Sequence, residues 1–266
     1  MVFIMVFEAQ VDKELSTLLE PHRKARETLA TLSRDIEVAN LLEQANIVSI
    51  ARMGYNDHGK VHAKIVAMNA IKIYNLFNNT DTPANIVRER VGDNEDVIVS
   101  LLIGAYLHDI GISVSRDSHD MLGVILGKGI LARILPLVTE DKEKTARMTP
   151  IILEEILCHL GHYRATSLEA KIVATSDGTD MTKGRARIPA KTSKPDIHQF
   201  SALAVEQVTI TRGEKKPIRI NIEMNDTAGV FQIEHQLVQK ITDVGFDDHV
   251  EIVGTIRNGP TVTYFI

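Results

Sequence analysis

The chain has 266 residues, of which 44% are hydrophobic and 24% are charged, and its formal net charge at pH 7 is −5. This size suits one large or two modest domains, each with its own core. The acidic balance argues against a general nucleic-acid binder, which would carry a basic surface. A single cysteine, Cys158, excludes a disulfide within these residues and is typical of a reducing compartment, so we expect a cytoplasmic protein.

The N-terminal stretch is apolar at first and then helical in pattern. Residues 1–7 are too few to span a bilayer and lack the basic flank of a secretory signal, so we expect a terminal strand or a packed extension and no membrane partner. Residues 11–45 repeat apolar side chains at helical spacing, and Pro21 suits the first turn of a new helix. The stripe predicts helices packed on their own domain or the arm of a coiled-coil homodimer. Its short length favours the packed helices.

Residues 47–190 have the pattern of successive helices. Strand alternation is absent, and polar breaks occur at 78–83 and 92–94. The run 97–107 is apolar on nearly all sides, which indicates a buried helix, and Gly111 is a plausible stop for it. We therefore predict an all-helical domain over residues 1–190.

The pattern changes after residues 188–195, a plausible linker with two prolines. Beyond it, alternating and β-branched runs have the period of strands. The expected elements are strands at 205–211, 218–223, 250–253 and 261–264 and a helix at 230–241. We predict that residues 191–266 form a small α+β domain, ordered strand, strand, helix, strand, strand, which mediates dimerisation or closes an active site. The chain as a whole is then of the α+β class.

His108 and Asp109 stand together at the end of the buried run. Ionisable side chains at such a place suffer a heavy desolvation penalty unless something compensates. Hydrogen bonding alone is one compensation, and a metal cation is another, because imidazole and carboxylate are good ligands for first-row divalent ions. Other histidines and acids on neighbouring apolar stretches favour the metal, since helical bundles build internal metal sites in this way. They are His62, His119, His159, His162 and Asp177.

The order His, His-Asp, Asp resembles the signature of the HD-domain metal-dependent phosphohydrolases, and His108–Gly111 matches the HDIG variant. Segments 54–62 and 176–187 resemble a poorly characterised prokaryotic branch of that superfamily, and the likeness extends over roughly residues 45–260. The resemblance implies a divalent iron, manganese, zinc, nickel or cobalt ion, with His108 and Asp109 in catalytic roles. Its implied ligands are His62, His108, Asp109 and Asp177.

Binuclear relatives in that superfamily place extra histidines between the His-Asp pair and the last Asp. His119 and His159 are the best candidates to hold a second ion, with Asp109 as a bridge, because a carboxylate has two oxygens. We prefer His159 to His162, since His159 ends an apolar stretch, whereas His162 lies beyond a glycine where the chain is expected to turn. One or two ions are therefore expected.

Paired metal ions suit the hydrolysis of phosphate esters, because they activate water and neutralise phosphoryl oxygens. A phosphate group also needs cations and hydrogen-bond donors from the protein. The candidates for contacting it are His58, Lys60, Arg116, His162, Lys183, Arg185 and Arg187. Asp180 is expected to orient a ligand histidine or an arginine. We predict a phosphatase or phosphodiesterase that cleaves a nucleotide-like phosphomonoester or phosphodiester with metal-activated water.

Departures from the family pattern limit the substrate. Ile112 stands where many HDIG phosphodiesterases have lysine, and no Gly-Tyr-Pro tripeptide follows, so the cyclic-diguanylate branch is not supported. Two other functions remain open: a degenerate HD module that senses a nucleotide or metal, and a di-iron oxygenase with similar ligands. The intact ligand set argues against the sensor, and iron that responds to oxygen would favour the oxygenase.

Overall fold

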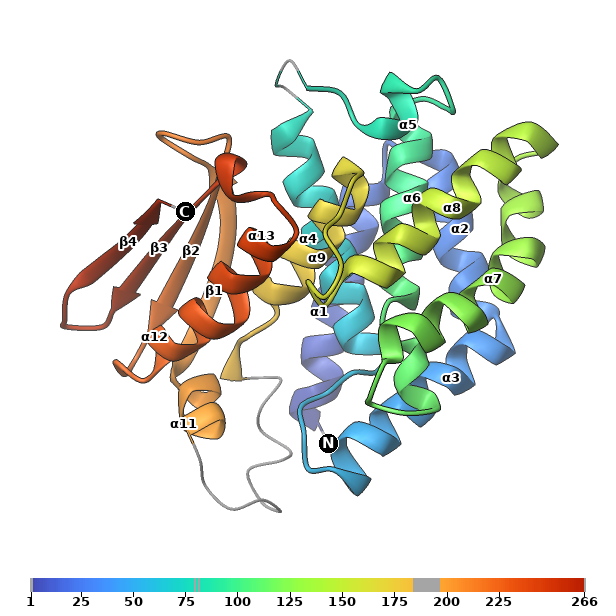
Figure 1. Ribbon diagram of the computed structural model, residues 1–266. Coiled ribbons are helices and arrows are strands. Elements are labelled where there is room, and N and C mark those ends of the chain that lie inside the picture. The colour runs from blue at the N-terminus through green and yellow to red at the C-terminus, as the bar shows by residue number, and fades with distance from the viewer. Residues whose placement is uncertain (1, 79, 81, 184–196, 266) are drawn as a thin grey trace.

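The structure is a computed structural model that describes all residues except 1, 79, 81, 184–196 and 266. A helical bundle forms the N-terminal part and a small sheet with its own helices forms the C-terminal part (Figure 1), which confirms the predicted α+β class. The bundle consists of α1 (Val2–Leu19), α2 (Arg23–Arg34), α3 (Ile36–Asn46), the π-helix η1 (Ile47–Arg52), α4 (Lys60–Phe77), α5 (Asn85–Arg88), α6 (Asn94–Leu107), the 3-10 turn η2 (Ile110–Ser113), α7 (His119–Val138), α8 (Lys142–Cys158) and α9 (Leu168–Thr179).

Helix α6 is the centre of the bundle. Every residue from Asp96 to Leu107 is buried, as the apolar run predicts, and α2, α4, α8 and α9 pack around the helix. Its start is fixed by a capping box, in which Asp93 accepts from the backbone N–H of Asp96 and the Asp96 side chain accepts from the N–H of Asp93. Because α6 is enclosed, the residues that follow it emerge in the interior of the bundle.

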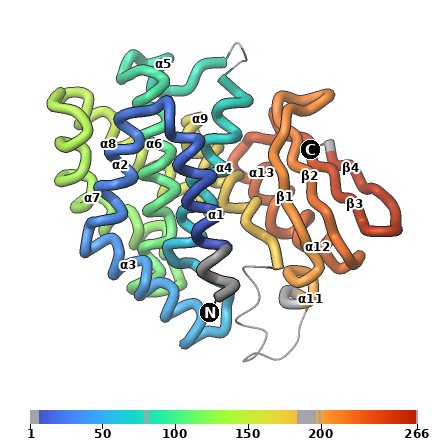
Figure 2. Tube along the Cα trace, turned by 180° about the vertical axis from the view of Figure 1, so that it is seen from behind, coloured from blue at the N-terminus to red at the C-terminus, as the bar shows by residue number. Residues whose placement is uncertain are grey.

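The N-terminal segment is helical from Val2 onward, so the alternative of a terminal strand is wrong. Val11, Leu15 and Leu19 are buried, and α1 lies along α4 while α2 lies along α6 (Figure 2). Pro21 occupies the turn between these first two helices. Both helices therefore pack on their own chain, as predicted from the short length of the stripe.

The C-terminal part begins with a helix that the sequence pattern does not indicate. Its elements are α11 (Ile197–Ala204), β1 (Val205–Arg212), β2 (Ile218–Met224), α12 (Gly229–Gln232), the π-helix η4 (Ile233–Val238), α13 (Gln239–Asp243), the 3-10 turn η5 (Asp247–His249), β3 (Val250–Ile256) and β4 (Thr261–Phe265). The predicted order of strands and helix is confirmed. The predicted boundary at residue 190 lies outside the described residues and stays a prediction.

The sheet has the order β1-β2-β3-β4, with β2 and β3 parallel and the two outer pairs antiparallel. A parallel pair needs a crossover connection, and α12 to α13 supply it. Ile218, Ile220 and Ile222 are buried on one face. One continuous apolar core joins these residues to the bundle, and the ring of Phe77 on α4 stacks on that of His249, with centroids 5.0 Å apart. The C-terminal part is therefore seated against α4 and α9.

Two helical segments are long and apolar enough to cross a membrane by length and composition alone. The first, Asn94–Ser113, is 94% buried inside the protein, as expected of a core helix, while His119–Val138 is 33% buried. One or two such helices are weak support for a membrane span, because core helices pass the same test. A cytoplasmic location without a membrane partner stays a prediction.

Candidate metal centre

Several helix ends meet at one buried point of the bundle. Each contributes imidazole or carboxylate side chains there, and each contributing residue is less than a tenth exposed. They are His62 in the first turn of α4, His108 and Asp109 directly after α6, His119 at the start of α7, His159 directly after α8, and Asp177 in the last turn of α9. The structure thus brings together all six side chains that the sequence singles out as metal ligands.

The approach of α7 to this point depends on Gly111, which does not end α6 as the sequence suggested. Helix α6 ends at Leu107, and Gly111 lies in η2. A Cβ atom at Gly111 would lie 2.0 Å from the carbonyl oxygen of His119 and 2.5 Å from the backbone nitrogen of Gly123. Glycine is needed here because backbone passes directly over backbone, and this places His119 beside Asp109.

One ligand group surrounds Oδ2 of Asp109. The Nε2 atom of His62 lies 3.3 Å from Asp109 Oδ2 and 3.1 Å from Asp177 Oδ1. The Nε2 atom of His108 lies 3.2 Å from Asp109 Oδ2 and 3.1 Å from His62 Nε2. We call His62, His108, Asp177 and this oxygen the first ligand group.

A second ligand group surrounds the other oxygen, Asp109 Oδ1. It lies 3.3 Å from Nε2 of His119 and 3.6 Å from Nε2 of His159, and those two nitrogens are 3.2 Å apart. Asp109 therefore stands between the two groups, with one oxygen in each.

The position of the hydrogen on each imidazole follows from the hydrogen bond made by Nδ1, the ring nitrogen that points away from the cluster. Nδ1 of His108, His119 and His159 lies 2.7, 2.8 and 2.6 Å from the backbone carbonyl oxygens of Ala105, Arg116 and Ile156. A carbonyl oxygen only accepts hydrogen bonds, so each Nδ1 carries the hydrogen and donates it. In the neutral ring the lone pair is then on Nε2, the atom that faces the cluster.

His62 has the same orientation for a different reason. Its Nδ1 lies 2.7 Å from Oδ2 of Asp180, and the carboxylate accepts the hydrogen. Asp180 thus holds the ring of His62 in place, the role expected for it, and a carboxylate behind a ligand histidine is a common feature of metal sites.

Facing lone pairs repel unless a cation lies between them. An added proton is one such cation, but burial lowers the pKa of His159 to about 4, so that ring is neutral at pH 7. Oδ2 of Asp109 is buried and has no hydrogen-bond partner among the residues that the structure describes. Neutral imidazoles and carboxylates fit a divalent transition metal ion. The cluster can therefore bind metal, although its donors do not select one element.

Sequence reasoning missed one side chain that contacts the cluster. Lys240 on α13 forms an ion pair with Oδ2 of Asp177. Burial is the largest single influence on the pKa of Asp177 and raises it, but the Lys240 ammonium and the other neighbours of the carboxylate together hold that pKa well below its usual value. A lysine on a helix of mixed polarity has the pattern of a solvated residue, so no signal in the sequence marks it.

Comparison with known proteins gives one relative. A protein of Methanocaldococcus jannaschii, described as "Uncharacterized protein MJ1020", is 40% identical over 226 residues, which cover 85% of this chain and 87% of that protein. The chain belongs to the family of this archaeal protein. No family model matches the chain, and no solved structure matches it. The helical bundle and the buried cluster of this chain are compatible with an HD domain but do not establish one.

Two predicted substrate residues lie next to the first ligand group. The ring of His58 is 5.7 Å from that of His62. Nδ1 of His58 donates to the carbonyl of Asn56 at 2.7 Å, so its Nε2 accepts from Arg116 Nη1 at 3.1 Å. The Arg116 guanidinium also lies over the ring of Tyr55, 5.8 Å from its centroid. The Arg116 side chain is thus linked to the cluster through His58, while its backbone carbonyl accepts from the cluster residue His119.

The other predicted substrate residues have contacts elsewhere or cannot be placed. Lys60 forms an ion pair with Glu8 of α1 at 2.9 Å, and Lys183 forms one with Glu206 of β1. His162 contacts Asp120 at 3.1 Å and its side chain is 66% exposed. Arg185 and Arg187 lie outside the described residues. Lys60 and Lys183 thus form ion pairs that connect elements of the fold, and the structure does not bring them to the cluster.

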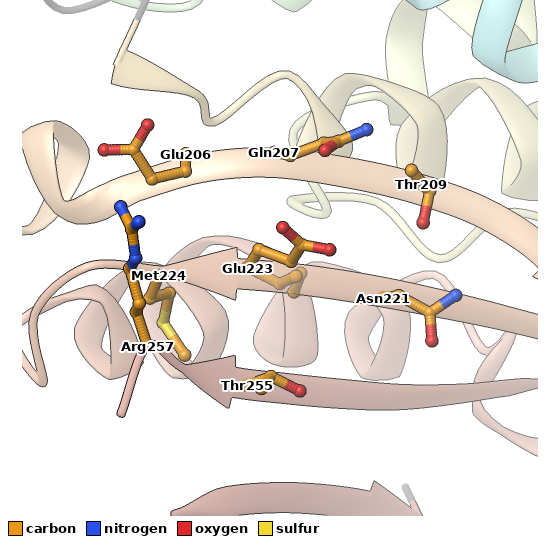
Figure 3. Close-up of a pocket in the computed structure, with 9 residues that line it drawn as sticks. Glu206, Gln207, Thr209, Asn221, Glu223, Met224, Thr255 and Arg257 are labelled. Atoms are coloured by element: carbon orange, nitrogen blue, oxygen red, sulfur yellow. The ribbon is translucent and has the colours of Figure 1, made fainter. Parts of the chain in front are cut away.

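A separate open hollow lies on the outer face of the sheet (Figure 3). Its side chains come from β1, β2 and β3 and from the residue after β3, and they include Glu206, Asn221, Glu223 and Arg257. Asn221 and Glu223 alternate with the buried isoleucines of β2, so the hollow is on the face opposite the core. None of the cluster residues lines it.

Proposed function

We propose that this protein is an HD-type metal-dependent phosphohydrolase that cleaves a phosphate ester of nucleotide-like type. The observation that supports this most is the convergence of imidazole Nε2 lone pairs on both oxygens of the buried Asp109. Hydrogen bonding within the described chain leaves Asp109 Oδ2 unsatisfied. The likeness of the ligand order to the HD signature supports phosphate chemistry in particular.

The two ligand groups suit two ions that share Asp109. His62, His108 and Asp177 would hold one ion, and His119 and His159 would hold the other. Bound divalent ions would lower the pKa of a coordinated water and neutralise charge on the phosphoryl oxygens. The chain's own residues would keep the ligand imidazoles in one tautomer, because carbonyl oxygens and Asp180 accept their Nδ1 hydrogens.

Arg116 and His58 are the protein groups best placed to receive the phosphate. A guanidinium has five N–H donors, and the contact with His58 uses one of them. The others can bind phosphate oxygens in pairs. Tyr55, which is 48% exposed beneath Arg116, offers an aromatic face to a planar group such as a nucleobase. This combination supports a nucleotide-like substrate.

The decisive experiment is metal analysis of the purified protein together with a screen of phosphomonoesters and phosphodiesters. The protein is stripped with a chelator, and manganese, iron, cobalt, nickel or zinc is restored singly. We expect bound metal in the purified protein and phosphate release that depends on the restored ion. Failure to bind any of the ions would end the proposal, and an iron absorption band that changes with oxygen would support the oxygenase instead.

A pair of variants distinguishes Arg116 from Lys60, both of which are predicted from the sequence to contact phosphate. Arg116→Ala removes the donors beside His58 and is expected to raise KM by about 10- to 100-fold, since a hydrogen bond to a charged group contributes about 1.5–3 kcal/mol. Lys60→Ala removes a cation held by Glu8 and should leave KM unchanged. Equal effects of the two substitutions in steady-state kinetics would contradict this placement of the phosphate.

A further inference from the structure

Asp177 has a different neighbour at each oxygen. Oδ1 belongs to the first ligand group and lies 3.1 Å from His62 Nε2, whereas Oδ2 forms the ion pair with Lys240. The two side chains of the pair are only 13% and 10% exposed. Lys240 comes from α13, so the C-terminal part of the chain reaches the cluster directly.

The position of Lys240 is fixed by close packing beside the ligand. Gly178 follows Asp177, and a Cβ atom there would lie 3.1 Å from Leu237 Cδ1 and 3.6 Å from Lys240 Cδ. Helix α9 therefore contacts η4 and α13 at the ligand itself. A second contact, from Lys171 Nζ on α9 to the carbonyl of Gly245 at 2.8 Å, attaches the same two parts away from the cluster.

This packing determines how Asp177 can act as a ligand. A carboxylate free to rotate can offer either oxygen, or both, to an ion. With Oδ2 paired to a lysine whose stem is packed against α9, Oδ1 is the oxygen that lies near His62 and His108, and the carboxylate plane is restrained. Groups that orient a ligand in this way commonly change metal affinity by about 10- to 100-fold.

We infer that Lys240 is a positioning residue that orients Asp177 as a one-oxygen ligand, so that the C-terminal α+β part completes the metal centre of the helical bundle. This inference rests on the metal binding of the proposed function. It assigns to the C-terminal part a direct role at the site, beyond closing over it or joining two copies of the chain.

The test uses the full chain with Mn²⁺ and Co²⁺ as probes. Lys240→Met removes the charge and keeps most of the stem, Lys240→Arg restores a cation, and Lys171→Met is the matched control, because it loosens the same interface without touching Asp177. After chelation, the dissociation constant of each ion is measured against a competing chelator, and the visible spectrum of the Co²⁺ form is recorded. Circular dichroism of the metal-free forms reports folding.

We expect Lys240→Met to weaken binding by about 10- to 100-fold and to alter the Co²⁺ spectrum, Lys240→Arg to recover part of the affinity, and Lys171→Met to match the wild type. A wild-type chain that binds neither ion overturns the proposed function and this inference together. Wild-type affinity in Lys240→Met overturns the inference alone. An equal loss in Lys171→Met also overturns it, because docking rather than the lysine would then set the affinity.

Discussion

Asp109 in the bundle and Glu251 in the sheet are both buried carboxylates, but their surroundings differ. Oε1 of Glu251 accepts from the backbone N–H of Glu214 at 2.9 Å and from Arg219 Nε at 2.6 Å, and Oε2 accepts from the N–H of Lys215 at 3.0 Å. Burial opposes ionisation, yet these donors lower the pKa of Glu251 from 4.5 to about 2. Asp109 instead faces imidazole nitrogens whose hydrogens are on the far side of the rings.

The difference shows that burial alone does not separate a structural acid from a functional one. What separates them is whether the neighbouring atoms donate. Glu251 is surrounded by N–H groups and closes the turn before β2, so its interactions are complete within the protein. Oδ2 of Asp109 has no donor among the residues that the structure describes, so a cation would complete its interactions.

The largest expected effect comes from removing the acid that lacks donors. Asp109→Ala should lose bound metal and lower hydrolysis by more than about 100-fold, beyond the usual effect of losing an orienting partner, while its far-ultraviolet circular dichroism stays helical. His108→Ala should behave in the same way. Full metal content and turnover in either variant, measured by elemental analysis and phosphate release, would remove the basis of the comparison.

A third buried acid, Glu155, sharpens the comparison. Only one of its two oxygens accepts a hydrogen bond from a described residue, and that donor, Ser100, is not in either ligand group. Ser100 donates to Oε1, Oε2 has no partner among the described residues, and burial raises the pKa well above its usual 4.5. The folded state therefore favours the protonated acid. Stability from this group is complete below pH 4.5 and declines as pH rises towards the raised pKa, by at most about 1.4 kcal/mol per pH unit.

Glu155→Gln should remove that decline. In urea titrations of the chelated protein between pH 5 and pH 8, the free energy of unfolding of the variant should fall less with pH than that of the wild type. If the free energy of unfolding fell equally with pH in the variant and the wild type, burial would not be raising the pKa of Glu155.

The smallest of the three effects is expected at the acid with complete donors. Glu251→Gln should lower the free energy of unfolding at pH 7 by about 1.5–3 kcal/mol, since hydrogen bonds to a charged group are lost, and leave metal affinity unchanged. The lowered pKa means that this stability is present above pH 4.5 and disappears as pH falls towards 2. Weaker metal binding in this variant would mean that the two acids are not independent.

The sequence predicts the parts of the site that depend on local pattern. A His-Asp pair at the end of an apolar run stands out because ionisable groups are rare there, alternation marks β2, and β-branched residues mark β1. It does not distinguish a short apolar strand from a helix at residues 2–7, since both give the same run. It also cannot pair Lys240 with Asp177 or Lys60 with Glu8, because such pairs are decided by how helices pack and leave no periodic trace.

The backbone crossing at Gly111 bears on the stoichiometry of the centre. An added Cβ would meet the carbonyl of His119 at 2.0 Å, so even alanine would push the start of α7 outward and carry His119 away from Asp109. His62 and Asp177 are held by other helices and would keep their places. A change of one codon, at a residue with no side chain of its own, would then be enough to disrupt the second ligand group and leave the first in place.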